Sequence, residues 1–356
     1  MIKSISYIER MKEKVEKIRK QERVVILAIE SSCDETSVAI VVNGRQVLSN
    51  IISTQIDIHR HFGGVVPEVA SRNHILNIIP LVEQALSSAK LTFDDIDAIG
   101  VTQGAGLVGA LLVGLTTAKA LSYALDKPLI AVNHIKGHIA ANYIAYPELT
   151  PPFMCLITSG GHTAIVNVDD YNHFKLVGST QDDAIGEAYD KVARVVGLDY
   201  PGGVKVDRLA QGVEPKIKFI QNDTLVNSYD ISYSGLKTAV INYVHKLKQN
   251  DEEVDIAQIC SSFQHEAVDM LTKKVLRACK EFGQKKLVLA GGVAANSYLR
   301  GSLTEKCKDL GIELYFPPME FCTDNAAMIG SVAYYQLLKE DPADLNISAL
   351  PSIALE

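Results

Sequence analysis

The feature that most constrains the fold of this 356-residue chain is a pattern that occurs twice. An apolar run at 24–30 is followed by the polar turn SSCDET and a second apolar run, and residues 151–170 repeat that order around the turn SGGH. Each opening is typical of a strand, a polar hairpin and a second strand. In both halves, further strands then alternate with helices. The pattern predicts an α/β protein with two β-β-β-α-β-α lobes, and we expect the first hairpin of each lobe to point into a cleft between them.

The length of the chain also favours two lobes, because one hydrophobic core rarely serves so many residues. We expect an N-terminal lobe formed by 24–133 and 325–356, and a C-terminal lobe formed by 134–324. A segment rich in Lys, Asn and Gln at about 205–250 indicates a mostly helical insertion in the second lobe. Residues 1–23 carry many charges around sparse apolar positions, so we expect an exposed, charged helical extension there.

Composition narrows the class of protein. The six cysteines lack C-x-x-C spacing, the N-terminus lacks the apolar core of a secretory signal, and no long apolar run predicts a membrane span. These features predict a cytoplasmic protein with reduced thiols. The net charge of −7 argues against a dedicated basic nucleic-acid binder, so any RNA must be met through a local patch or a partner's surface.

Three glycine-containing turns are candidate anion sites. They are TSGGH at 158–162, YPGG at 200–203 and AGGVAAN at 290–296. Glycine exposes backbone N–H groups to an anion, and the third turn lies between an apolar run and a helical pattern, where phosphate is favoured. Neither G-x-G-x-x-G nor G-x-x-x-x-G-K-[ST] occurs, so the dinucleotide and P-loop interpretations lose their main support. Nucleotide binding and ordinary turns both remain open.

Two histidines stand four residues apart in the stretch NHIKGH. On a helix, His134 and His138 would project from one face with their Cβ atoms roughly 6 Å apart. Such a pair is either a metal clamp or two buried, satisfied side chains. Isoleucine follows His134, so this is not the H-E-x-x-H motif of a metalloprotease. Asp324 precedes an apolar helix as a cap or as a third ligand, and two His with one Asp would leave positions on a divalent metal open.

Carboxylates also gather around the first hairpin. The turn ESSCDET contains Glu30, Asp34 and Glu35. A second group, Asp182, Asp183, Glu187 and Asp190, lies in QDDAIGEAYDK, and Asp207 stands near other turn residues. We expect most of these acids to be solvated turn acids.

Eight stretches, taken together and in order, resemble the TsaD family of bacterial tRNA threonylcarbamoyladenosine transferases. They are ESSCDETS, GGVVPEVASRNH, NHIKGHIAAN, TSGGHT, GEAYDKVARVVGLDYPGG, SYSGLKTAV, AGGVAANSYLR and FCTDNAAMIG. The resemblance runs from about Ile26 to the end of the chain and leaves the preceding residues outside. It implies the actin-like, Hsp70-like ATPase fold, with two RNase H-like lobes. It also implies transfer of a threonylcarbamoyl group from threonylcarbamoyl-AMP to N6 of adenosine 37, in tRNAs that read codons beginning with A, which forms t6A.

The resemblance also implies roles for particular residues. The implied ligands of one divalent metal, Fe²⁺ first and Zn²⁺ second, are His134, His138 and Asp324. The implied binding residues for the phosphate and acyl part of the donor are Ile157, Thr158, Ser159, Gly160 and Gly161. Those for its adenosine half are Asp190, Gly203, Asp207 and Asn296.

Chemistry adds one role and the resemblance adds partners. Adenine N6 loses a proton on acylation, so we assign a nearby carboxylate, Asp34 or Glu35, as general base. Adenosine 37 lies in a tRNA anticodon loop, a single-stranded target. The family's bacterial members work with a TsaB-like paralogue and a TsaE-like ATPase, and the small-residue helix at 107–126 is a candidate surface for the former or an ordinary core helix.

Three other functions compete with this one. A small-molecule kinase of the same fold predicts substrate-dependent ATP turnover and leaves the His-His-Asp set unexplained. A metalloprotease lacks its glutamate after His134. An Hsp70-like nucleotide-gated binding module needs a β-rich peptide-binding segment, which the sequence does not contain after the second lobe.

Overall fold

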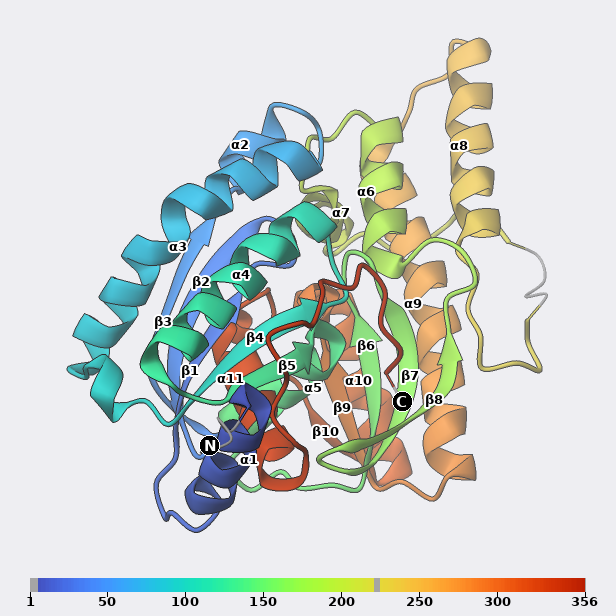
Figure 1. Cartoon of the computed structure of the whole chain (residues 1–356). Helices are drawn as coiled ribbons and strands as arrows, with labels where there is room; N and C mark the ends of the chain where they lie inside the picture. The colour runs from blue at the N-terminus through green and yellow to red at the C-terminus, as the bar shows by residue number, and fades with distance from the viewer. Residues whose placement is uncertain (1–5, 221–224, 356) are drawn as a thin grey trace, which may run out of the picture. The chain divides into compact units, whose positions relative to one another are not determined.

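A computed structural model describes residues 6–220 and 225–355 (Figure 1). The chain divides into two compact units: unit 1 contains residues up to 150 together with 323–355, and unit 2 contains 151–322. The predicted boundary at 134 was therefore early. The helix that carries the two histidines belongs to unit 1, because it packs on the C-terminal helix of that unit rather than on the second sheet.

The two units have the same sheet topology. Unit 1 has the order β3-β2-β1-β4-β5 and unit 2 the order β8-β7-β6-β9-β10. The first three strands of each sheet pair antiparallel, and the remaining pairs are parallel. The predicted β-β-β-α-β-α order is confirmed. The strands of unit 1 are β1 (Val25–Glu30), β2 (Glu35–Val42), β3 (Gln46–Thr54), β4 (Ala98–Gly104) and β5 (Leu129–Asn133). Those of unit 2 are β6 (Phe153–Thr158), β7 (Thr163–Asp170), β8 (His173–Ser179), β9 (Lys286–Ala290) and β10 (Glu313–Tyr315).

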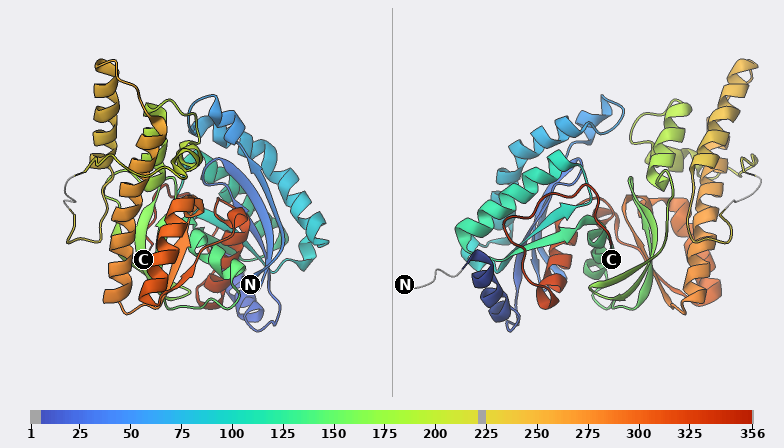
Figure 2. Two further views of the ribbon diagram at one scale, coloured as in Figure 1. Left: turned by 180° about the vertical axis from the view of Figure 1, so that it is seen from behind. Right: turned by 45° about the vertical axis from the view of Figure 1, so that its right-hand side comes forward.

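Helices cover both faces of the unit 1 sheet. α3 and α4 pack on one face over an aliphatic core, and α11 lies on the other face together with α5 (Figure 2). Because both faces are covered, β1 and β2 are buried along their whole length, as their apolar sequences require. The helices are α2 (Ile56–Arg60), α3 (Pro67–Ala89), η1 (Phe93–Asp95), α4 (Val108–Leu125), α5 (His134–Ala145) and α11 (Ala326–Lys339).

Helix α4 is long and apolar enough to cross a membrane by length and composition alone, which the sequence reading had missed. A third of it is buried in the protein, and it packs on α3 and on strands β1, β4 and β5. The core helix of a soluble protein can have the same length and apolar composition.

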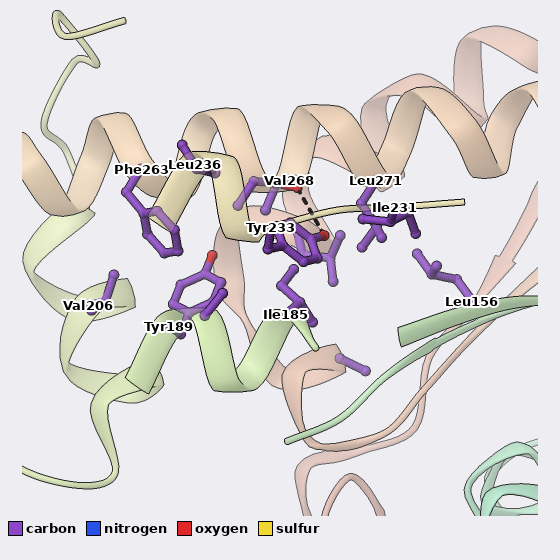
Figure 3. Close-up of a cluster of buried hydrophobic side chains, with 14 of the residues drawn as sticks. Leu156, Ile185, Tyr189, Val206, Ile231, Tyr233, Leu236, Phe263, Val268 and Leu271 are labelled. Atoms are coloured by element: carbon purple, nitrogen blue, oxygen red, sulfur yellow. Dashed lines mark hydrogen bonds between the residues drawn. The ribbon is translucent and has the colours of Figure 1, made fainter. Parts of the chain in front are cut away.

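Unit 2 places its large core under five α-helices. They are α6 (Ile185–Val195), α7 (Gly202–Ala210), α8 (Ser234–Gln249), α9 (Ile256–Glu281) and α10 (Ser297–Leu310), with the short turns η2 (Gly292–Ala295) and η3 (Met319–Phe321). Figure 3 shows part of that core, where Tyr189 of α6 meets Phe263 of α9 edge to face at 5.0 Å. Of the predicted insertion, α7 and α8 are helical, and the described residues between them form turns and irregular chain.

The N-terminal segment is not an exposed extension, which corrects the prediction made above. It forms helix α1 (Tyr7–Ile18), and the apolar residues on one side of this helix are buried: Met11, Val15 and Ile18. Lys14 Nζ lies 2.5 Å from Asp126 Oδ2 at the end of α4. Arg19 donates from Nε to the Leu337 carbonyl at the end of α11, at 2.8 Å. The sparse apolar positions were therefore a docking stripe rather than a sign of solvation.

Candidate functional site

The predicted metal ligands come together within unit 1. His134 and His138 lie on the first turns of α5, and Asp324 lies two residues before α11. Asn133 caps α5 by accepting a hydrogen bond from the Ile135 N–H at 2.8 Å. A Cβ on Gly137 would meet Ile329 at 2.9 Å, so glycine there lets α5 lie close against α11. This close approach brings both imidazoles to Asp324.

The spacing of the donor atoms fits a metal ion. The Nε2 atoms of His134 and His138 lie 3.4 Å and 3.2 Å from Asp324 Oδ1. Two ligand atoms bound to one ion at about 2.0–2.1 Å and at the tetrahedral angle stand roughly 3.3 Å apart. His138 is 1% exposed at its side chain, and neither of its ring nitrogens makes a hydrogen bond among the described residues. A buried polar nitrogen without such a bond is costly, so the His-His-Asp set fits a cation at this point.

Electrostatic attraction stabilises the cluster that His134, Asp324 and Glu30 form. Burial lowers the pKa of His134, but Asp324 and Glu30 more than offset it, and the pKa lies well above its usual value. Burial raises the pKa of Asp324, and the two histidines reverse that and hold it far below its ordinary range. Asp324 is therefore a carboxylate at neutral pH, which is the form that binds a metal.

The acids of the first hairpin are buried, and so depart from the solvated turn acids expected at most of the acidic positions, of which Asp182 and Glu187 are exposed. Glu30 is 0% exposed, and Asp34 and Glu35 are 6% and 9% exposed. Thr54 donates to Glu35 Oε1 at 3.1 Å. Burial, followed by the charges of Asp324 and Asp34, raises the pKa of Glu35 to about 9. For Asp34 and Glu35 the sequence does carry a signal, because the apolar residues 25–29 lead into this turn from a buried strand.

In unit 2 two of the three glycine turns, at 158–162 and 290–296, meet at the end of β6. Gly291 has φ +91°, and a Cβ there would lie 2.4 Å from the Thr158 carbonyl oxygen, so that position needs glycine. The Gly186 N–H donates to the Ser159 carbonyl at 3.3 Å. At Gly160 and Gly161 the space beyond the Cα atoms is open. Both glycines are exposed, so an anion can approach the backbone of this turn.

The implied adenosine-binding residues hold neighbouring elements in place. Asp190 accepts at Oδ1 from the N–H groups of Gly202 and Gly203, at 2.7 and 3.3 Å, which caps α7. Burial raises the pKa of Asp190, partly offset by these two bonds. Both carboxylate oxygens of Asp207 accept from Ser297, at 3.0 Å from its N–H and 2.9 Å from its hydroxyl. These bonds tie α6 to α7 and α7 to α10.

Beside them unit 2 contains a hollow of about 820 Å³. Ser297, which Asp207 holds, lines it, and so does Gln264, whose Oε1 accepts from Asn296 Nδ2 at 2.8 Å. The volume lies in the range of small-molecule and cofactor sites. Sequence reasoning missed Gln264 and Ser297, because each sits in a helix and gains its place only through tertiary contacts.

Comparison with known proteins agrees with this arrangement. The family model described as TsaD, tRNA N6-adenosine threonylcarbamoyltransferase, matches residues 46–331. The chain belongs to the TsaD family. A relative from Clostridium perfringens, named tRNA N6-adenosine threonylcarbamoyltransferase, is 56% identical over 335 residues, which cover 94% of this chain and 99% of that protein. A relative from Clostridium botulinum with the same name is 56% identical over 340 residues, with the same two coverages.

Solved structures confirm the fold of this TsaD-family chain. Full-length HypF in a phosphate- and nucleotide-bound form aligns with a TM-score of 0.61 at 17% identity, over 90% of this chain and 47% of that one. Component A of the (R)-2-hydroxyglutaryl-CoA dehydratase of Acidaminococcus fermentans aligns with a TM-score of 0.53 at 14% identity, over 89% of this chain and all of that one. The predicted actin-like ATPase fold is thereby confirmed, whereas the residue roles remain predictions.

Proposed function

We propose that this protein transfers the threonylcarbamoyl group of threonylcarbamoyl-AMP to N6 of adenosine 37 in tRNAs that read codons beginning with A. The observation that carries the proposal is 56% identity, over nearly its whole length, to proteins named for that transfer. The predicted kinase alternative finds no support in the family match. The acceptor, tRNA, also agrees with the predicted cytoplasmic location.

Unit 1 supplies the proposed metal site, with His134, His138 and Asp324 as ligands. Nitrogen and carboxylate donors suit Fe²⁺, our first choice, and Zn²⁺. When bound, the ion would act as a Lewis acid toward oxygen atoms of threonylcarbamoyl-AMP. The chain's own part is to hold two neutral imidazoles and one carboxylate in a buried, preorganised set, which avoids rearrangement during the reaction.

Unit 2 holds the donor in this proposal. The amides of the β6–β7 turn, residues 157–161, bind its phosphate and acyl part. Asp190, Gly203, Asp207 and Asn296 bind the adenosine half next to the 820 Å³ hollow. The open space at Gly160 and Gly161 and the links from Asp207 and Asn296 to the hollow's lining support this assignment.

The transfer step needs a base from the chain. As N6 attacks the carbamoyl carbonyl, a C–N bond forms, the bond to the phosphate oxygen breaks, and AMP leaves. The proton of N6 passes to a carboxylate, which we assign to Asp34 or Glu35. The raised pKa of Glu35, about 9, leaves that group protonated at neutral pH and so favours Asp34 as the first acceptor.

Partners complete the proposal: a TsaB-like paralogue, a TsaE-like ATPase and the tRNA anticodon loop. Large apolar side chains are exposed on the adjacent helices α3 and α4, namely Ile75, Leu76, Ile79, Val108 and Leu112. Apolar side chains gathered in this way are typical of a protein-binding surface. We propose that the TsaB-like paralogue binds this surface, which includes residues of the predicted helix 107–126.

The test is a single-turnover assay with the partners, synthetic threonylcarbamoyl-AMP and a tRNA transcript carrying A37. We expect t6A in the nucleoside digest, measured by mass spectrometry, and none from a matched transcript with G37. No t6A with all components present, together with ATP turnover that depends on a small metabolite, would instead establish the kinase.

A further inference from the structure

A buried carboxylate outside the assigned ligand set contacts one of the two histidines. Glu30 is the last residue of β1 and is 0% exposed. Its Oε2 lies 3.1 Å from His134 Nδ1. We propose that Glu30 is a positioning residue, which fixes the tautomer and orientation of His134 so that Nε2 presents its lone pair to the metal. The inference rests on the metal site of the proposed function and adds a residue to it.

The chemistry of imidazole gives the contact its direction. A neutral imidazole carries one N–H, and the other nitrogen is the one that binds a metal. A carboxylate can only accept, so Glu30 requires the proton on Nδ1 and leaves Nε2 unprotonated. That Nε2 is the atom 3.4 Å from Asp324 Oδ1. Ser32 Oγ also lies 3.2 Å from Nδ1, but a hydroxyl can donate or accept and so does not select a tautomer.

Glu30 is itself held in place. Its Oε1 accepts from the Ser32 N–H at 2.5 Å, and the Thr102 hydroxyl, on the neighbouring strand β4, donates to Oε2. With the His134 contact, these bonds satisfy a carboxylate that would otherwise be costly to bury. The carboxylate of Glu30 is therefore fixed by contacts from β1 and its turn and from β4, and it restrains the His134 imidazole in turn.

The two histidines differ in this respect. Nδ1 of His134 has Glu30, whereas Nδ1 of His138 has no hydrogen-bond partner among the described residues. His138 is placed by burial and by its edge-to-face contact with His134, whose ring centroid lies 4.7 Å away. Loss of the Glu30 contact would therefore leave neither imidazole oriented by a hydrogen bond to a carboxylate through Nδ1.

The test uses Zn²⁺ as the probe and metal-free full-length protein. We expect Glu30→Gln to weaken Zn²⁺ binding by about 10- to 100-fold in a chelator competition, the usual cost of removing such an outer-shell partner. Imidazole ¹⁵N NMR of metal-free Glu30→Gln, recorded at a pH high enough for His134 to be neutral, should show that His134 shifts toward the Nε2–H tautomer relative to the parent. Asp97→Asn is the matched control, because Asp97 accepts from the Val25 N–H at the opposite end of the same strand. It should bind Zn²⁺ like the parent.

Two further variants separate the possible explanations. Glu30→Asp keeps the charge but not the reach, so positioning predicts weak binding, whereas parent-like binding would show that charge alone matters and would overturn the proposal. Thr102→Val loosens Glu30 without removing it and should give a smaller loss, which serves if Glu30→Gln fails to fold. Parent-like affinity and tautomer in Glu30→Gln would also overturn the inference. If His134→Ala binds Zn²⁺ as the parent does, the metal site of the proposed function is itself wrong.

Discussion

The first hairpin of unit 1 and the first hairpin of unit 2 occupy the same place in the same topology, and they carry opposite chemistry. In unit 1 the turn after β1 leads to the buried carboxyl groups of Asp34 and Glu35, and the charge of Asp324 contributes to the raised pKa of Glu35. In unit 2 the turn after β6 is Ser159–His162, with two exposed glycines at which a Cβ would meet open space. One turn therefore concentrates negative charge, and the other is built for an anion.

The comparison teaches that the sheet sets the position and the turn residues set the chemistry. Both strands that lead into these turns are buried along their whole length and are apolar up to their last residue, so each turn is held rigidly. A buried carboxyl cluster needs cations, which the histidines and the proposed metal would provide. A glycine turn can bind an anion without a charged side chain, because its backbone N–H dipoles attract the anion. Variants in the two units should therefore fail in different ways.

The largest effect is expected from removal of a metal ligand. His138→Ala should lose the bound metal and lower single-turnover transfer by at least about 1,000-fold, because the remaining two ligands hold the ion weakly. Metal content by mass spectrometry and t6A formation measure the two losses. His173→Ala is the control, since that histidine is largely exposed and, among the described residues, forms an ion pair with Asp169 alone. Full metal content in His138→Ala would contradict the ligand assignment.

The carboxyl groups of the first hairpin should matter next. Asp34→Asn is expected to slow single-turnover transfer by about 100-fold, the lower end for loss of a general base, without loss of the metal. Glu35→Gln should have a weaker effect, because Glu35 already holds its proton at neutral pH. Unchanged transfer in both variants would show that neither is the base, and a larger loss in Glu35→Gln would reverse the assignment.

The glycine turn of unit 2 should give a defect of binding only. Gly161→Ala adds a methyl group to open space, so folding should be unaffected while the affinity for threonylcarbamoyl-AMP falls by about tenfold. Gly235→Ala is matched, because a Cβ there also meets nothing within 4 Å. Donor binding by calorimetry and metal content are the readouts. Metal loss in Gly161→Ala would contradict this prediction, because it would show that a change in the glycine turn of unit 2 also disrupts the metal site of unit 1.

The two sites should also differ in their dependence on pH. The pKa of His134 is raised in the metal-free chain, so its proton competes with the metal until the pH rises through that raised value. Zn²⁺ binding should therefore tighten with increasing pH, by up to about tenfold per unit while one proton is released. The affinity for threonylcarbamoyl-AMP, measured for the parent protein and for Gly235→Ala, should not rise with pH in this way. A flat Zn²⁺ profile between pH 6 and 8 would contradict the proton competition.

The sequence predicted those features that local patterns encode. The doubled order of strands and turns gave the two lobes, and the spacing of His134 and His138 gave one helix face, which α5 confirms. The burial of Glu30 and its contact with His134 were not predicted, because they depend on how β1 meets β4 and α5. Gln264 was missed for the same reason. Motif spacing shows which residues share a turn, but not which distant partner orients them.

Helix α1 is the clearest case of that limit, and it gives the smallest expected effect on the reaction. Met11 is fully buried although it lies in a segment whose charge content predicted exposure. Met11→Ala should destabilise unit 1 by about 2 kcal/mol, the low end for a buried methionine, and lower the Tm by roughly 4–8 °C. Lys17→Ala, on the exposed side of the same helix, should change neither. Transfer and metal content at 25 °C should be unchanged in both variants, because α1 contacts the ends of α4 and α11 rather than any ligand. A loss of metal in Met11→Ala would show instead that the packing of α1 reaches the ligand set through α11.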